Sequence, residues 1–132
     1  MRIAIVDGQG GGIGKRIVEI LSRQLKLDHE LIALGTNALA TSNMIRAGAS
    51  IGATGENAIK VTSQKADYII GPIAIVMADS MMGEITPIMA SAIASSSAKK
   101  ILIPLNKCNT AVVGTKSTKL NDLLEMIVEE IQ

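Results

Sequence analysis

Short apolar runs alternate along this chain with segments in which apolar residues recur at helical spacing. The first run ends at Asp7 and extends from about Arg2 to Val6; after Arg2 it contains only apolar residues, several of them β-branched. Such a run is typical of a strand that is buried on both faces, as in a parallel sheet covered by helices. We expect three more strands of this kind, at Glu30 to Leu34, Asp67 to Gly71 and Lys100 to Leu105.

The segments between these strands carry helix signals. Thr36 or Asn37 is placed to cap a helix that Gly48 ends, and Thr86-Pro87 combines an N-cap residue with proline at the first helical position. The pattern therefore predicts four helices, over about Gly12 to Lys26, Asn37 to Ala47, Thr86 to Ser95 and Leu120 to Ile131.

Three stretches are harder to assign. Ser50 to Asn57 contains two glycines and several locally hydrogen-bonding side chains, which predicts a loop before a short helix or strand near Ala58 to Gln64. Ile73 to Met82 is apolar enough for a buried helix, but its periodicity does not separate a helix from an extended segment. Thr110 to Gly114 is a candidate edge strand.

Strands and helices that alternate through short links predict an α/β fold. We expect a doubly wound, mainly parallel sheet of four to five strands, in one Rossmann-like nucleotide-binding domain over residues 1–132. Ligands of such sheets sit outside the carboxyl ends of the strands. Those ends hold small and polar residues here: Asp7 to Gly14, Gly35-Thr36-Asn37, Gly71-Pro72 and Asn106 to Asn109.

The turn after the first strand is the most distinctive segment. Five of its seven positions from Gly8 to Gly14 are glycine, so the backbone is able to lie close to a bulky ligand. The turn opens a helix, whose dipole favours an anion at its free N–H groups. We therefore expect a phosphate of a nucleotide or phosphorylated metabolite against Gly8, Gln9, Gly10, Gly11, Gly12, Ile13 and Gly14. The alternative is a tight turn that is purely structural.

The spacing Gly8-xxx-Gly12-Ile13-Gly14 resembles the dinucleotide turn of the short-chain dehydrogenases and reductases. The resemblance implies NADP or NAD as cofactor. No carboxylate ends the second strand to bind a ribose, so NADP is preferred, with Thr36 and Asn37 able to contact a ribose or 2′-phosphate or simply to cap a helix. The Tyr-Lys pair of that family is missing, because Pro72 stands four positions after Tyr68, which argues against a reductase.

Other candidate chemistry is sparse. Asp7, Asp79 and Glu84 are candidate carboxylates for general acid-base catalysis or for binding magnesium, but nothing in the sequence places them together. His29 is the only histidine, which excludes a histidine-based metal cluster and a Ser-His-Asp triad within one chain, and we expect no metal site. A small transferase, lyase or hydrolase that acts on a phosphorylated metabolite would use Asp7, Lys107 or Cys108. For Asp7 the alternative is a carboxylate held by backbone N–H groups of the turn, and for Cys108 a small buried residue. Asn106 belongs to the predicted opposing wall of the ligand site.

Composition limits the partners. The formal net charge of +1 gives no broad positive electrostatic field to attract nucleic acid or an anionic membrane. Because Tyr68 is the only aromatic residue, the chain also lacks the aromatic platforms on which single-strand binders stack bases. Cys108 is the only cysteine, so no internal disulfide forms, and we expect a cytoplasmic protein without a membrane span. Methionines 77, 81, 82 and 89 suggest core packing first and a homo-oligomer interface second.

Five segments are distributed over nearly the whole chain: Val6 to Lys15, Ala33 to Ala38, Gly52 to Ala58, Gly83 to Pro87 and Ile103 to Asn109. Together they resemble a family of small bacterial proteins that is catalogued as a domain of unknown function. The resemblance implies a self-contained Rossmann-like protein and supplies no activity. A third hypothesis thus stands beside ligand binding and catalysis: an oligomeric scaffold or sensor whose glycine turn is purely structural.

Overall fold

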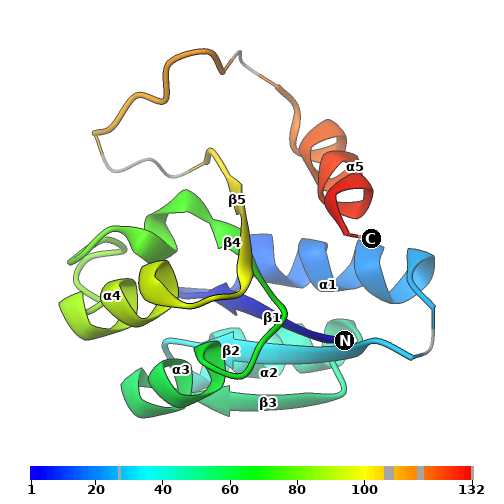
Figure 1. Cartoon of the computed structure of the whole chain (residues 1–132), viewed down its shortest axis with the longest axis horizontal. Helices are drawn as coiled ribbons and strands as arrows, with labels where there is room; N and C mark the ends of the chain where they lie inside the picture. Colours follow the sequence, from blue (N-terminus) through cyan, green and yellow to red (C-terminus); the bar gives the residue numbers. More distant parts are fainter. Residues whose placement is uncertain (27, 106–108, 116–117, 132) are drawn as a thin grey trace.

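The computed structural model describes residues 1–26, 28–105, 109–115 and 118–131 (Figure 1). In this part of the chain five strands form one parallel sheet in the order β3-β2-β1-β4-β5. This arrangement confirms the predicted α/β fold. The strands are β1 (Arg2–Asp7), β2 (Glu30–Gly35), β3 (Ile51–Thr54), β4 (Tyr68–Pro72) and β5 (Lys99–Ile103).

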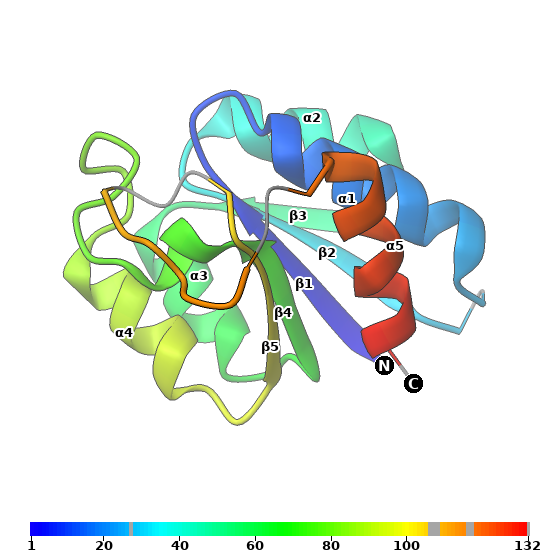
Figure 2. The same ribbon diagram turned by 90° about the horizontal axis from the view of Figure 1, so that it is seen from above.

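Helices cover both faces of the sheet (Figures 1 and 2). Each face has its own apolar core, and β1 contributes to both: Ile3 and Ile5 pack on one side, Ala4 and Val6 on the other, and all four are fully buried. This burial confirms the prediction for the first strand. One face carries α1 (Gly12–Gln24), α2 (Ala38–Ala47) and α5 (Leu120–Glu130); the other carries α3 (Glu56–Ser63), the 3-10 helix η1 (Ile73–Val76) and α4 (Pro87–Ser95).

The strand order places a topological switch beside β1. From β1 the chain proceeds outward through β2 to β3, and then returns to β4 on the other side of β1 before reaching β5. The connecting helices leave β1 and β4 on opposite faces, which opens a crevice at the carboxyl ends of these two strands. The glycine turn follows β1 directly, so it lies at the mouth of this crevice.

Three sequence predictions are wrong or incomplete. Ile51–Thr54 is a strand rather than a loop, because it pairs in parallel with β2 from Ile32↔Ile51 to Gly35↔Thr54. Only η1 is helical in the segment Ile73 to Met82; positive φ angles at Asp79, Met81 and Met82 then turn the chain. Thr110 to Gly114 forms no strand.

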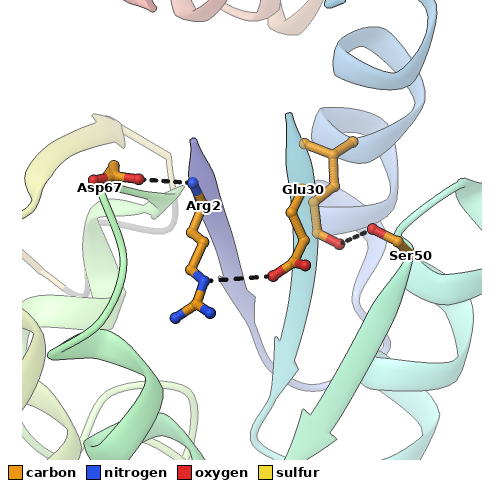
Figure 3. Close-up of polar contacts among 5 residues, drawn as sticks. Arg2, Glu30, Ser50 and Asp67 are labelled. Atoms are coloured by element: carbon orange, nitrogen blue, oxygen red, sulfur yellow. Dashed lines mark hydrogen bonds and ion pairs between the residues drawn. The ribbon is translucent and has the colours of Figure 1, made fainter. Parts of the chain in front are cut away.

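Polar contacts join the strands at their amino ends, opposite the glycine turn (Figure 3). The Arg2 N–H donates to Oδ2 of Asp67 over 2.7 Å, and Nε of Arg2 lies 3.8 Å from Oε1 of Glu30. Ser50 Oγ donates to the carbonyl of Leu31 over 3.1 Å, which ties the start of β3 to β2. The ion pair is exposed and therefore contributes little to stability.

Candidate functional site

The strand-to-helix turn is closed by its own backbone. The Gly11 N–H donates to the Gly8 carbonyl over 2.8 Å, and the Lys15 N–H donates to the Gly11 carbonyl over 2.8 Å. Gly11 is the N-cap of α1 and has left-handed angles, φ 71° and ψ 22°. A side chain at this residue would strain the backbone, so the turn needs glycine here whatever it binds.

Packing explains the glycines on the inner side of the turn. A Cβ atom at Gly8 would lie 2.6 Å from Oγ1 of Thr36 and 2.7 Å from Sδ of Met81. At Gly11 it would lie 2.9 Å from Cα of Ala40, in the backbone of α2. At Gly14 it would lie 2.5 Å from Sδ of Met44 and 2.9 Å from Cβ of Asp7. These three glycines let the turn pack against the protein itself.

Gly10 and Gly12, on the outer side of the turn, are not crowded in this way. A Cβ atom at either position would meet no atom within 4 Å, and neither residue has a φ angle in the left-handed region. Both residues are exposed, and in the described part of the chain their N–H groups donate no hydrogen bond. Neither packing nor backbone conformation therefore accounts for glycine at these two positions.

Asp7 folds back onto the turn that follows it. Its side chain is buried; Oδ1 accepts from the Gly8 N–H over 2.8 Å and Oδ2 from the Gly14 N–H over 2.7 Å. Burial raises the pKa of Asp7, although the N–H groups of Gly14, Gly8 and Ile13 partly offset that rise. This is the geometry of the structural alternative, in which the carboxylate organises the turn. Both oxygens are engaged, which leaves Asp7 poorly placed for acid-base chemistry.

Glu84 reaches the same turn from the loop between η1 and α4. Its Oε1 accepts three hydrogen bonds: 2.5 Å from Thr36 Oγ1, 2.8 Å from the Gln9 N–H and 2.9 Å from Asn37 Nδ2. The hydrogen bond from Thr36 is the main reason why the pKa of Glu84 is lowered. Glu84 thus places a half-buried carboxylate at the carboxyl end of β2, where none was expected from the sequence.

Thr36 and Asn37 are largely occupied within the protein. Asn37 Oδ1 accepts from the Ala40 N–H over 2.9 Å and caps α2, while its Nδ2 donates to the Gln9 carbonyl over 2.8 Å. The hydroxyl of Thr36 donates to Glu84. The premise for preferring NADP, that no carboxylate lies near the end of β2, therefore does not hold.

The sequence offers Glu84 as one of three candidate carboxylates, but nothing in it places Glu84 beside Thr36, which lies 48 positions away in the chain. Thr86 and Pro87 mark only the start of the helix that follows, where Thr86 Oγ1 caps α4 by accepting from the Met89 N–H over 3.1 Å. The loop before it is shaped by contacts within itself, such as the 2.7 Å hydrogen bond from the Asp79 N–H to the Ile85 carbonyl. Tertiary folding alone brings this loop over the turn.

Several predicted site residues are not tested. Asn106, Lys107 and Cys108 lie outside the described residues, so the opposing wall and two catalytic candidates stay predictions. Among the residues that the structure describes, no three or more His, Cys, Asp and Glu side chains are grouped so as to hold a metal ion. Within the same residues, every helix is too short or too polar to cross a lipid bilayer.

A cavity of about 370 Å³ lies elsewhere, between β5 and α5. Aliphatic side chains dominate its lining, including Ile101, Ile103, Leu123 and Ile127. A binding site for a small metabolite needs a few polar groups that converge on the ligand. The polar residues in the lining of the cavity are Thr115, Thr118 and Glu130. The glycine turn instead brings backbone N–H groups together with the carboxylates of Asp7 and Glu84, so we place the candidate site at the turn.

Comparison with known proteins identifies the family of this chain. No curated protein and no solved structure matches this chain. A family model does match it, over residues 2–132, and its description is Domain of unknown function (DUF3842). The chain therefore belongs to the family described as Domain of unknown function (DUF3842).

Proposed function

We propose that this protein binds a nucleotide or dinucleotide, with a phosphate group held by the backbone N–H groups of Gly10 and Gly12. The observation that carries the proposal is the open, unpaired state of these two glycines within the described structure. Alanine at such positions generally stabilises a protein by about 0.4–1 kcal/mol, because it restricts the unfolded chain. A ligand that needs close approach to the backbone gives a reason for glycine instead.

The position of the turn supports the same function. It connects β1 to α1 beside the switch point between β1 and β4, and α1 directs the positive end of its dipole toward the turn. Asp7 already occupies the N–H groups of Gly8 and Gly14. A phosphate at the outer side of the turn would therefore use Gly10 and Gly12 rather than Gly14.

The position of Glu84 favours some nucleotides over others. Its Oε1 accepts three hydrogen bonds, whereas Oε2 accepts none within the described part of the chain. Oε2 is suited to accept a hydrogen bond from a ribose hydroxyl, and its negative charge would repel a 2′-phosphate. We therefore favour NAD or an adenine nucleotide over NADP.

Charge also limits the number of phosphates. Asp7 and Glu84 both stand beside the turn, and the nearby Glu84 charge contributes to the raised pKa of Asp7. Two carboxylates oppose a highly charged anion. We therefore expect a dinucleotide diphosphate or a monophosphate to bind better than the triphosphate of ATP.

The structural alternative has its own supporting observation. Side chains of this protein already hold much of the turn: Asn43 Nδ2 donates to the Gly10 carbonyl over 2.9 Å, in addition to the hydrogen bonds made by Asp7, Asn37 and Glu84. In an oligomeric scaffold or sensor, the turn would need no interactions beyond these hydrogen bonds. Ligand titration separates the two functions directly.

The test is a thermal unfolding series with NAD, NADP, AMP, ATP and inorganic phosphate. A ligand present at about 100 times its Kd stabilises the folded state by about 2.7 kcal/mol, a readily measured shift. We expect NAD or AMP to raise the Tm more than NADP or ATP does. Absence of a shift with every compound would overturn the proposal.

A pair of variants tests the location. Gly12→Val places a branched side chain over the outer N–H groups and should remove the shift without unfolding the protein, since the position is open. Ala94→Val, at an exposed position of α4, is the matched control and should retain the shift. A shift that survives Gly12→Val would show that the ligand binds somewhere else.

A further inference from the structure

The glycine turn begins with a four-residue β-turn, Gly8 to Gly11. Its closing hydrogen bond runs from the Gly11 N–H to the Gly8 carbonyl over 2.8 Å. Gln9 is the first central residue and has a left-handed φ of 50°, whereas Gly10, the second central residue, does not have a positive φ. A positive φ at the first central position alone is the pattern of a type II′ turn, which favours glycine at that position.

The two central residues stand in the reverse of the order that backbone conformation favours. A left-handed φ is costly for a residue with a side chain, and asparagine and aspartate ease that cost by hydrogen bonding locally, an advantage that the longer glutamine lacks. At Gly10, by contrast, a Cβ atom would meet no atom within 4 Å, so a side chain would fit there. Folding alone would therefore favour Gly-Gln over the Gln-Gly that the chain contains.

The Gln9 side chain has no structural role that offsets this cost. It is exposed, and its carboxamide takes part in no hydrogen bond with the residues that the structure describes. The hydrogen bonds of Gln9 are made by its backbone: the N–H donates to Glu84 Oε1 over 2.8 Å, and the carbonyl accepts from Asn37 Nδ2 over 2.8 Å. Glycine would make both bonds equally well.

The same two bonds hold Gln9 in its left-handed conformation. Glu84 comes from the loop before α4, and Asn37 is the N-cap of α2, so two separate parts of the fold restrain this one peptide. Surrounding contacts that keep a residue in a sparsely populated conformation are common at ligand sites. The exposed carboxamide is thus attached to a well-fixed backbone beside the open N–H groups of the turn.

We propose that Gln9 is a specificity-determining residue of this site, and that its carboxamide donates a hydrogen bond to the phosphate on Gly10 and Gly12. This inference rests on the proposed function and adds a side chain to a phosphate site otherwise made of backbone. The Gly10 N–H belongs to the next residue, so the carboxamide starts within one peptide unit of that phosphate. Its Nε2 carries two N–H donors, and phosphate oxygens are acceptors.

A neutral donor suits this position. Lysine or arginine in place of Gln9 would meet the Glu84 carboxylate, which already accepts from the Gln9 N–H, and would pair with it. A carboxamide has no charge, so its donors stay available to the ligand. Glutamine therefore supplies a donor for the phosphate without a competing ion pair.

Titration of the parent and two variants with AMP and NAD tests this inference. Gln9→Gly keeps both backbone hydrogen bonds and relieves the left-handed conformation, so it should raise the Tm of the ligand-free protein by roughly 3 °C. It should nevertheless weaken binding about tenfold, the lower end for a hydrogen bond to a charged group. Gln9→Glu keeps the length and the backbone cost but replaces the donors by a negative charge. It should weaken binding further without raising the Tm.

Met82→Gly is the matched control. Met82 also has a left-handed φ, of 54°, and its side chain is 96 % exposed, but it lies outside the glycine turn. This variant should raise the Tm as Gln9→Gly does and should leave both affinities unchanged. An equal loss of affinity in Met82→Gly would trace the effect to added chain flexibility and would overturn the inference.

The other outcomes separate this inference from the proposed function. A parent that binds no nucleotide would overturn both. A Gln9→Gly variant that binds as tightly as the parent would overturn the inference and leave the proposed function intact. A lower Tm in Gln9→Gly would remove its premise that glutamine is costly here. Affinity retained in Gln9→Glu would mean that the side chain accepts a hydrogen bond, as from a ribose hydroxyl, and would overturn the assignment to phosphate.

Discussion

The inner and outer sides of the glycine turn obey different constraints. On the inner side, Gly8, Gly11 and Gly14 have no space for a Cβ atom, and Asp7 binds the N–H groups of two of them. On the outer side, Gly10 and Gly12 border open space. The inner glycines are therefore explained by folding, and only the outer pair calls for a ligand.

The difference shows how a glycine-rich turn should be interpreted. Five glycines in seven residues resemble a phosphate-binding loop, but three of the five would be needed in a turn that binds nothing. The environment of each glycine distinguishes one that folding requires from one that calls for a ligand. The relevant features are the sign of φ, the distance to the nearest atom and the partner of the N–H group. For this chain these criteria reduce the candidate site to Gly10, Gly12 and the carboxylate of Glu84.

The largest expected effect comes from adding one methyl group on the inner side. Gly11→Ala should lower the free energy of unfolding by about 2–5 kcal/mol, since left-handed backbone costs a side chain about 1–2 kcal/mol and overpacking adds about 1–3 kcal/mol. Gly10→Ala on the outer side should instead raise it by about 0.4–1 kcal/mol, because alanine restricts the unfolded chain. Urea unfolding measures both. Similar losses in the two variants would erase the distinction between the sides.

An intermediate effect is expected from the inner carboxylate. Asp7→Asn should lower the free energy of unfolding by about 1–3 kcal/mol at acid pH, because both oxygens of a protonated carboxyl group keep lone pairs for the Gly8 and Gly14 N–H groups, whereas an amide nitrogen accepts from neither. The pKa of Asp7 is raised by burial, so its favourable contribution is complete below 3.8 and is lost as the pH rises through the folded-state value. The deficit of the variant should therefore shrink toward neutral pH in urea unfolding. A deficit that grows with pH would contradict the burial of this carboxylate.

The smallest effect is expected from the outer carboxylate, with the opposite pH dependence. Glu84→Gln should cost about 0.5–1 kcal/mol at pH 7, because glutamine keeps the acceptor oxygen but loses the charge, in a half-exposed place. The pKa of Glu84 is lowered, so its stabilisation is present above 4.5 and is lost as the pH falls through the folded-state value. The two stability curves should converge in acid. Parallel curves would mean that the Glu84 charge does not hold the turn.

Much of the fold follows from local pattern. β1 was predictable because Ile3 to Val6 are apolar on both faces, and α4 because Thr86-Pro87 both caps and starts a helix. β3 was not predictable, since four residues with one glycine carry too little local preference. Its strand conformation comes from hydrogen bonds to β2. The positive φ angles after η1 likewise have no local signature, because Asp79, Met81 and Met82 are not glycine.

Some features of the candidate site likewise follow from local sequence, and others depend on tertiary contacts. Sequence alone determined that a glycine-rich turn joins the first strand to a helix at the carboxyl edge of a parallel sheet, because strand burial, glycine content and helical spacing are properties of neighbouring residues. Only the tertiary structure decided which glycines are free. The atoms that crowd the three inner glycines belong to Met81, Ala40 and Met44, which come from other parts of the fold. The tertiary structure also brought Glu84 to Thr36, across 48 positions of chain. Contacts of that range depend on how helices and loops pack on the sheet, and no local pattern encodes them.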